Sequence, residues 1–112
     1  MTRRFQGMNA WLLQRVSAIY IAVFVLYVVA VYLFKPPLNY MEFKAWITHP
    51  FMSICLMVFV ALLLGHAWVG MRDVFMDYIP SLVIRAAALL LLAFGLVACG
   101  IWTARILLLA ML

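Results

Sequence analysis

The chain has 112 residues, of which 71% are hydrophobic and only 10% are charged. A soluble domain is about half apolar and one quarter charged, so this composition excludes a soluble protein and indicates an integral membrane protein. The net charge of +5 comes from eight cations that are scattered along the chain. Such scattering does not favour nucleic acid as a partner.

Three uncharged runs predict three transmembrane helices, and each is about 20 residues long, enough to cross the ~30 Å hydrocarbon core of a bilayer. The runs are 16–34, 50–71 and 86–104. We therefore expect an all-α integral membrane protein with a single membrane-anchor domain over residues 1–112. The expected helices cover about 15–34, 50–73 and 82–108. No room is left for an extramembrane domain, so any large catalytic machinery belongs to another polypeptide.

The residues up to Gln14 are polar enough to lie at the membrane surface, with Phe5 and Trp11 as aromatic interface anchors. Arg15 lies where the first helix enters the headgroup zone. It is either a snorkelling cation that fixes helix depth or a hydrogen-bond donor to a carboxylate or quinone oxygen. The first run ends in FKPP without a small-residue cleavage site, which favours a retained helix over a signal peptide.

Two consecutive prolines after Lys35 stop the first helix, because proline cannot continue the hydrogen-bond ladder. Residues 38–48 are amphipathic and predict a short surface helix on the outer face of the membrane. Pro50 suits the first turn of the second transmembrane helix, with Thr48 or His49 as its cap.

The third transmembrane helix is expected to begin near Ser81 or Arg85, after a proline. Its glycines, Gly95 and Gly100, permit a close approach of neighbouring helices.

The cations predict the orientation of the chain in the membrane, because the cytoplasmic side carries the excess of Lys and Arg. Five lie on one side, namely Arg3, Arg4, Arg15, Arg72 and Arg85. Three lie on the other, namely Lys35, Lys44 and Arg105. We therefore expect a cytoplasmic N-terminus and a periplasmic C-terminus. A start at Met1 without a transit-peptide leader favours a bacterial inner membrane.

Residues 65–80, GHAWVGMRDVFMDYIP, place several ionisable groups beside an apolar run, where such groups usually mark a functional site. His66 lies about five residues inside the second span. It is either a packing and hydrogen-bonding residue or an axial ligand of haem iron. Gly65 and Gly70 leave space beside the helix for a flat macrocycle or another backbone.

The other histidine, His49, lies 17 positions before His66, which is about 25 Å along a continuous helix. Two axial ligands must lie on opposite faces of one iron, so His49 is excluded as the partner of His66. A second histidine ligand would come from another chain. We assign His49 to capping or surface contact.

Asp73 and Asp77 fall within about 20° of the direction of His66 at 100° per residue, so a polar stripe leads from the histidine toward the membrane surface. Arg72 and Asp73 fit a solvated helix exit. For Asp77 and Tyr78 a functional role is favoured over a merely solvated position. A phenol held by a carboxylate could donate a hydrogen bond to a quinone carbonyl and feed protons during reduction of the quinone.

These residues resemble a known family. The sequence HAWVGM at 66–71, followed by Asp77-Tyr78 and then Arg85, is similar to the small hydrophobic membrane anchor of bacterial succinate dehydrogenase. The segment 15–19, RVSAI, is similar to the Arg-Ala-Thr-Ala-Ile type segment of that family. Arg72-Asp73 departs from the Trp-Gln that can follow the motif in relatives.

The resemblance implies a subunit of respiratory complex II, active in aerobic respiration and the tricarboxylic acid cycle. It would pack with a second three-helix cytochrome b subunit and dock the iron–sulfur and flavoprotein subunits, with no succinate oxidation by the chain alone. His66 would be one axial ligand of a shared haem b. Tyr78, with Asp77 beside it, would contact ubiquinone, and Arg15 would lie near the haem propionates or the quinone pocket.

Three alternatives stay open from the sequence. The first is the anchor of a fumarate reductase, which works in the reverse direction. The second is a small transporter or proton-conducting subunit, although the three uncharged runs contain no acid to carry an ion. The third is a membrane scaffold without a redox group, in which His66 only hydrogen-bonds to a neighbouring helix.

Overall fold

The computed structural model describes residues 2–112 and the side chains of residues 7–112. The helices are α1 (Thr2–Phe34), α2 (Tyr40–Thr48), α3 (Pro50–Tyr78) and α4 (Leu82–Met111), and residues 2–112 contain no strand. Three of them are long and apolar enough to cross a membrane, namely Gly7–Phe34 of α1, α3 and α4. The predicted all-α fold with three membrane-spanning helices is therefore confirmed.

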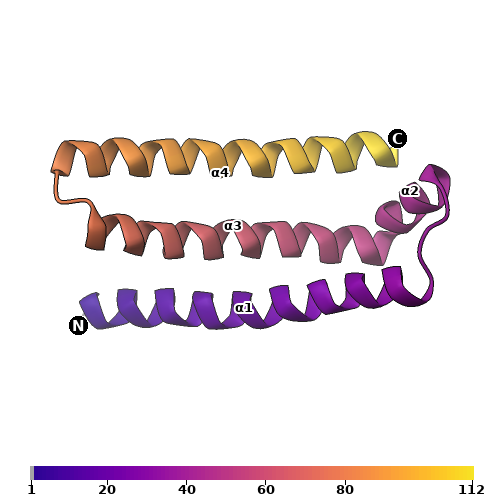
Figure 1. Ribbon diagram of the computed structural model, residues 1–112, viewed down its shortest axis with the longest axis horizontal. Helices are drawn as coiled ribbons and strands as arrows, with labels where there is room; N and C mark the ends of the chain where they lie inside the picture. The colour runs from indigo at the N-terminus through magenta and orange to yellow at the C-terminus, as the bar shows by residue number, and fades with distance from the viewer. Residues whose placement is uncertain (1) are drawn as a thin grey trace.

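α3 is the central helix of the protein. Figure 1 shows α1 and α4 running antiparallel to α3 on its two sides, and contacts join α3 to both of them. No α1–α4 contact occurs within the described part of the chain. The N-terminus and the α3–α4 turn lie at one end, called the Tyr78 end below, and α2 and the C-terminus lie at the other, the α2 end (Figure 1).

Helix α1 begins much earlier than the apolar run that predicted it. The residues up to Gln14 were expected to form a polar surface segment, but they belong to α1, which starts at Thr2. The reason is that hydropathy marks the part of a helix that crosses lipid, whereas a helix continues until something breaks it. No proline precedes Lys35. The side chains of Arg3, Arg4 and Phe5, assigned above to the membrane surface, lie outside the described residues.

The other helix ends follow the expected chemistry. The Asn39 side chain caps α2 by accepting from the Glu42 N–H at 2.9 Å. His49 caps α3 by accepting from the Phe51 N–H at 3.3 Å, with Pro50 in the first turn, as predicted. Ser81 caps α4. α3 and α4 each extend a few residues beyond their predicted ends, to Tyr78 and Met111.

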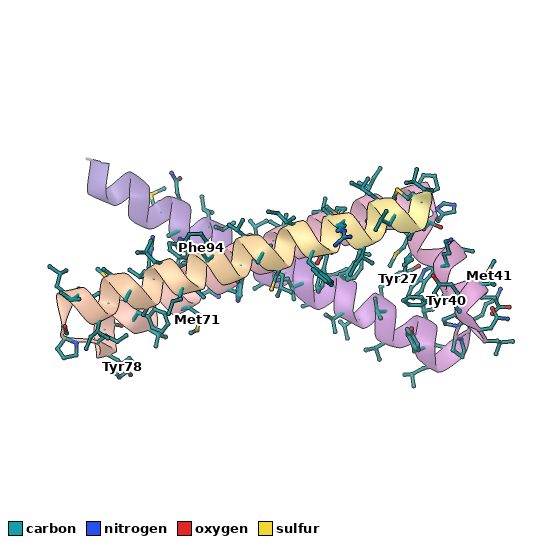
Figure 2. The ribbon with its side chains drawn as sticks, turned by 90° about the horizontal axis from the view of Figure 1, so that it is seen from above. Tyr27, Tyr40, Met41, Met71, Tyr78 and Phe94 are labelled. Carbon is teal, nitrogen blue, oxygen red and sulfur yellow. The ribbon has the colours of Figure 1, made fainter. Side chains whose placement is uncertain are left out.

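The interior of the bundle is small, and most large apolar side chains point outward. α1 and α3 pack through Phe24 and Phe59, whose rings stack with centroids 4.5 Å apart. Side chains such as Phe94, which is 72% exposed, cover the outer surface (Figure 2). In a membrane protein such a surface faces lipid tails or other helices. The large exposed apolar area is therefore available to lipid and to partner subunits.

Candidate functional site

His66 makes a specific contact with α1. Its Nδ1 atom lies 2.9 Å from the hydroxyl oxygen of Ser17, across the α1–α3 interface. Ser17 is fully buried, and its hydroxyl also lies 3.2 Å from the main-chain oxygen of Gln14, to which it donates. The ring of His66 is half-buried. One edge of the imidazole is thus held by the chain itself, deep within the apolar part of the bundle.

The glycines near His66 face α1. A Cβ atom on Gly65 would lie 3.7 Å from Leu13, and one on Gly70 would lie 3.6 Å from the side-chain nitrogen of Gln14. Both distances are ordinary contacts, and Val69, which lies between the glycines in sequence, is buried. Of the two uses predicted for this space, a macrocycle or another backbone, the structure shows a neighbouring helix beside both glycines. Small residues let α1 approach closely enough for Ser17 to reach His66.

Gln14 adds a second polar group to this interface. Its side-chain oxygen is buried and forms no hydrogen bond with residues 7–112. A buried amide oxygen without a donor is costly, so such an atom usually has a partner in the complete assembly. The α1–α3 interface near His66 therefore holds polar groups that sequence inspection did not single out.

Asp77 and Tyr78 lie in the last turn of α3. The Tyr78 side chain is 79% exposed, and Asp77 is also exposed. No hydrogen bond joins Asp77 to Tyr78 among the described residues, so the carboxylate does not hold the phenol as the sequence suggested. Neighbouring residues of a helix point about 100° apart, which explains this separation. The two side chains project from the Tyr78 end without a partner from the described chain.

α3 is one continuous helix, so His66 and Tyr78 are separated by about 18 Å of helix rise. A groove of about 630 Å³ lies between α1 and α3 on the Tyr78 side of His66. It is lined by Gly7, Asn9, Ala10, Leu13, Val69 and Arg72. Tyr78 and Asp77 are not among these residues. The structure thus separates the polar stretch into a buried region and an exposed one.

Arg72 and Asp73 form an ion pair with each other. The guanidinium Nη2 lies 3.3 Å from the Asp73 carboxylate, and the two side chains are 40% and 60% exposed. Exposed pairs of this kind are worth at most about 1 kcal/mol. This geometry agrees with the interpretation that both residues lie at a solvated helix exit.

Arg15 lies at the same depth as His66, since Ser17 is only two residues further along α1. Two residues turn a helix by about 200°, so Arg15 points away from the side of α1 that contacts α3. Its guanidinium stacks over the Trp11 ring, 5.5 Å from the ring centroid, and its side chain is exposed. Arg15 is therefore not brought together with His66 inside this chain.

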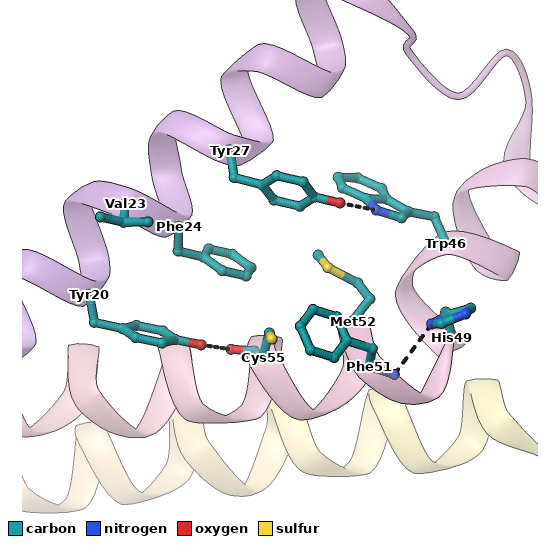
Figure 3. Close-up of a pocket in the computed structure, with 9 residues that line it drawn as sticks. All are labelled: Tyr20, Val23, Phe24, Tyr27, Trp46, His49, Phe51, Met52 and Cys55. Atoms are coloured by element: carbon teal, nitrogen blue, oxygen red, sulfur yellow. Dashed lines mark hydrogen bonds between the residues drawn. The ribbon is translucent and has the colours of Figure 1, made fainter.

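His49 lies at the opposite end of α3 from Tyr78 and borders a different pocket. This pocket has a volume of about 500 Å³ and lies between α1, α2 and α3 (Figure 3). Its lining residues are Tyr20, Val23, Phe24, Tyr27, Trp46, His49, Phe51, Met52 and Cys55. Across it, the Tyr20 hydroxyl donates to the Cys55 carbonyl at 2.7 Å, and the Trp46 indole N–H donates to the Tyr27 hydroxyl at 3.4 Å. His49 acts as a helix cap at its rim.

Comparison with known proteins decides the family. Residues 2–102 match the family described as succinate dehydrogenase/fumarate reductase transmembrane subunit. The chain belongs to this family. It is 30% identical over 97 residues to the succinate dehydrogenase hydrophobic membrane anchor subunit of Coxiella burnetii (strain RSA 493 / Nine Mile phase I). This similarity covers 87% of the chain and 84% of that relative.

Membership of this family, together with the three apolar helices, makes the chain a multi-pass membrane anchor subunit. The resemblance that residues 66–71 and 77–78 suggested is confirmed at the level of the family. The alternative of a small transporter subunit gains no support from it.

Sequence inspection missed the roles of Ser17, Gln14 and Tyr20. Ser17 was noted only as part of the RVSAI segment, and its contact with His66 spans 49 positions. Serine is frequent in membrane helices and attracts no attention in an apolar run. One signal could have indicated a polar face toward α3. Polar side chains recur every three residues at Gln14, Ser17 and Tyr20, which places them on one side of the helix.

Proposed function

We propose that this chain is the anchor subunit of a bacterial succinate:quinone oxidoreductase. It docks the flavoprotein and iron–sulfur subunits at the inner membrane and packs with a second three-helix cytochrome b subunit. It shares haem b with that subunit and contributes to the site of ubiquinone reduction. The observation that supports this proposal best is the half-buried imidazole of His66, held by Ser17, in a chain that belongs to the family.

The donor set around His66 fits a haem shared between two chains. Ser17 occupies Nδ1, while Nε2 forms no hydrogen bond with residues 7–112, so one nitrogen is left for a metal. No group of three or more His, Cys, Asp or Glu side chains that could hold an ion by itself is found among the described residues. A single histidine suits haem, because the porphyrin and a partner chain would provide the other ligands of the iron. When bound, haem b supplies a one-electron carrier beside the quinone site.

The quinone contacts belong to the exposed end of α3. The Tyr78 hydroxyl would donate a hydrogen bond to a quinone carbonyl oxygen, and the Asp77 carboxylate nearby would take up protons from water and pass them on for the reduction. Both side chains are exposed in this chain. The proposal therefore requires that the partner subunits cover them and complete the pocket.

Arg15 is proposed to contact the haem propionates or the quinone pocket. Its depth along α1 matches that of His66, and its charge suits a carboxylate. Because Arg15 points away from α3, the propionate or quinone would have to lie on the outer side of α1, and the partner subunit would have to pack there.

The orientation we propose places the Tyr78 end in the cytoplasm. Arg15, Arg72 and Arg85 lie on the half of the bundle that includes this end, whereas Lys35, Lys44 and Arg105 lie toward the α2 end. The positive-inside rule then gives a cytoplasmic N-terminus and a periplasmic C-terminus. This orientation brings Asp77 and Tyr78 to the side on which the soluble subunits would bind.

The test is a reduced-minus-oxidised spectrum of the complex that copurifies with a tagged chain, together with identification of its subunits. Replacement of His66 by alanine should abolish or strongly alter the b-haem absorbance. His49→Ala is the matched control, because it removes the other histidine without touching the proposed ligand. An unchanged spectrum in His66→Ala would exclude His66 as a ligand and leave a scaffold without this redox group.

A further inference from the structure

We propose that Ser17 is a positioning residue that selects the iron-binding tautomer and ring orientation of His66. This inference rests on the proposed function, because it concerns how the chain presents His66 to haem. The observation that carries it is the contact between the buried Ser17 hydroxyl and His66 Nδ1, at 2.9 Å.

The Ser17 hydroxyl has one proton, and the structure directs it to the Gln14 carbonyl oxygen, 3.2 Å away. A hydroxyl that donates its proton elsewhere can only accept a hydrogen bond from a neighbouring nitrogen. In the proposed arrangement the bond between Ser17 and His66 runs from an N–H at Nδ1 to the hydroxyl oxygen. In the neutral ring, a proton on Nδ1 leaves Nε2 with its lone pair.

Burial makes this arrangement selective. Ser17 is 0% exposed, so water cannot replace either of its hydrogen bonds. In the opposite tautomer, Nδ1 would need the serine proton, and an N–H at Nε2 would need an acceptor. Among residues 7–112 no acceptor for Nε2 is found. The tautomer with a bare Nε2 thus pairs the Nδ1 proton of His66 with the Ser17 oxygen and the Ser17 proton with the Gln14 main-chain oxygen.

The same hydrogen bond orients the ring and changes how strongly its Nε2 lone pair would bind a metal. Histidine ligands commonly donate their second N–H to an oxygen, which fixes the ring and raises its basicity. A more basic histidine ligand would favour ferric over ferrous iron, so with haem bound this hydrogen bond would lower the midpoint potential. Loss of the hydroxyl should therefore raise the potential and release the ring from its fixed plane.

The chain contains a matched control for the loss of a serine hydroxyl. Ser53 of α3 is 4% exposed, and its hydroxyl donates to the Pro50 carbonyl at 3.0 Å, the same local bond that Ser17 makes to Gln14. Ser53 does not contact His66. Ser17→Ala and Ser53→Ala therefore remove equivalent buried hydroxyls, but only the first removes a partner of His66.

The experiment compares Ser17→Ala, Ser17→Thr and Ser53→Ala in the purified complex. Redox titration of the b-haem absorbance gives the midpoint potential, and the electron paramagnetic resonance g values of the ferric haem report the orientation of the axial rings. We expect a higher potential and altered g values in Ser17→Ala. Ser17→Thr, which keeps the hydroxyl, and Ser53→Ala should match the wild type.

An unchanged potential in Ser17→Ala, or an equal shift in Ser53→Ala, would overturn the inference. If Ser17→Ala does not retain haem, Ser17→Thr decides the matter. Retention of haem with a wild-type potential in Ser17→Thr supports a role of the hydroxyl. Loss of haem in Ser17→Thr overturns the inference, because the site would then depend on the size of serine and not on its hydroxyl. These outcomes are distinct from failure of the proposed function, which His66→Ala reveals through an unchanged spectrum.

Discussion

The two polar regions of α3 differ in how much of each this chain completes. Around His66 the half-buried imidazole, the buried Ser17 hydroxyl and the Gln14 carbonyl are joined by hydrogen bonds. At the Tyr78 end, the phenol and the Asp77 carboxylate are exposed and form no hydrogen bond with the described residues. A buried polar group needs a hydrogen-bond partner within the folded chain, whereas an exposed one can bond to water until a partner subunit binds.

One helix thus carries two polar regions that depend to different degrees on other subunits. In the His66 region, the contact between His66 and Ser17 is made within this chain, while the buried side-chain oxygen of Gln14 has no partner among residues 7–112. The Tyr78 region carries ionisable side chains that no other part of the described chain covers, so its geometry would depend on neighbouring subunits. Variants in the two regions should therefore fail in different ways.

Tyr78→Phe tests the exposed region and has the largest effect expected outside His66. Removal of the phenol donor should lower succinate:quinone reductase turnover by about 10²-fold, the scale of a lost proton donor. Succinate oxidation by a soluble artificial acceptor and the haem spectrum should stay unchanged, because the ring is kept and His66 is about 18 Å away along the helix.

Tyr40→Phe is the control for this variant, because Tyr40 is also a highly exposed tyrosine and lies at the α2 end. It should keep full activity in both assays. Equal losses of activity with quinone and with the soluble acceptor in Tyr78→Phe would mean that the tyrosine serves assembly and that the two regions are not independent.

Gly100→Leu tests whether the organised region depends on α4. Even a Cβ atom at this glycine would lie 2.9 Å from Cδ1 of the Leu64 side chain, so a whole leucine side chain would force Leu64 or α4 to move. Overpacking of this kind costs about 1–3 kcal/mol. The thermal midpoint of the detergent-purified complex should fall, while the haem spectrum should be kept at low temperature because Ser17 and His66 lie on the α1 side.

Gly95→Leu is the matched variant, since no atom lies within 4 Å of a Cβ at that position. Within this chain it should cost nothing. If the thermal midpoint fell as much in Gly95→Leu as in Gly100→Leu, a partner subunit would have to cover this face of α4. A change in the haem spectrum of Gly100→Leu would contradict the independence of the His66 region from α4.

Tyr20→Phe tests a second bond between α1 and α3. The Tyr20 hydroxyl donates to the Cys55 carbonyl at 2.7 Å, on the α2 side of Ser17. Its loss should lower stability by about 1 kcal/mol, the net value of a typical hydrogen bond. If Ser17 alone sets the state of His66, the haem potential should stay at its wild-type value. A shift in potential would instead indicate that the whole α1–α3 interface controls the ring.

Arg72→Gln should have the smallest effect. Its ion pair with Asp73 is exposed, and such pairs contribute at most about 1 kcal/mol. We expect no measurable change in haem potential and a change in thermal stability within about 0.5 kcal/mol. A clear loss of quinone reduction in this variant would move Arg72 from the solvated helix exit into the quinone site.

Much of the fold could be predicted because its signals are local. The apolar runs indicated three membrane helices, Pro50 and His49 marked the start of α3, and Ser81 marked the start of α4. The start of α1 at Thr2 could not be read in the same way. Hydropathy reports where lipid surrounds a helix, and it does not report where the backbone hydrogen bonds of that helix begin.

The candidate site was predicted only in part, for a related reason. His66 and Tyr78 stand out because ionisable groups are rare beside apolar runs. Ser17 does not stand out, because a serine is cheap to place in a membrane helix when it bonds to its own backbone. Its importance depends on which residue of another helix lies opposite.

The sequence by itself determined the class of this protein, the number of its membrane helices and the residues of α3 that carry ionisable chemistry. These properties follow from the cost of exposing polar groups to lipid, which acts residue by residue. The tertiary structure alone decided that Ser17 meets His66, that Gly65 and Gly70 face α1, and that Arg15 points away from α3. The rotation and packing of the helices determine these contacts and directions. Both depend on how the surfaces of two helices fit together and not on either helix alone.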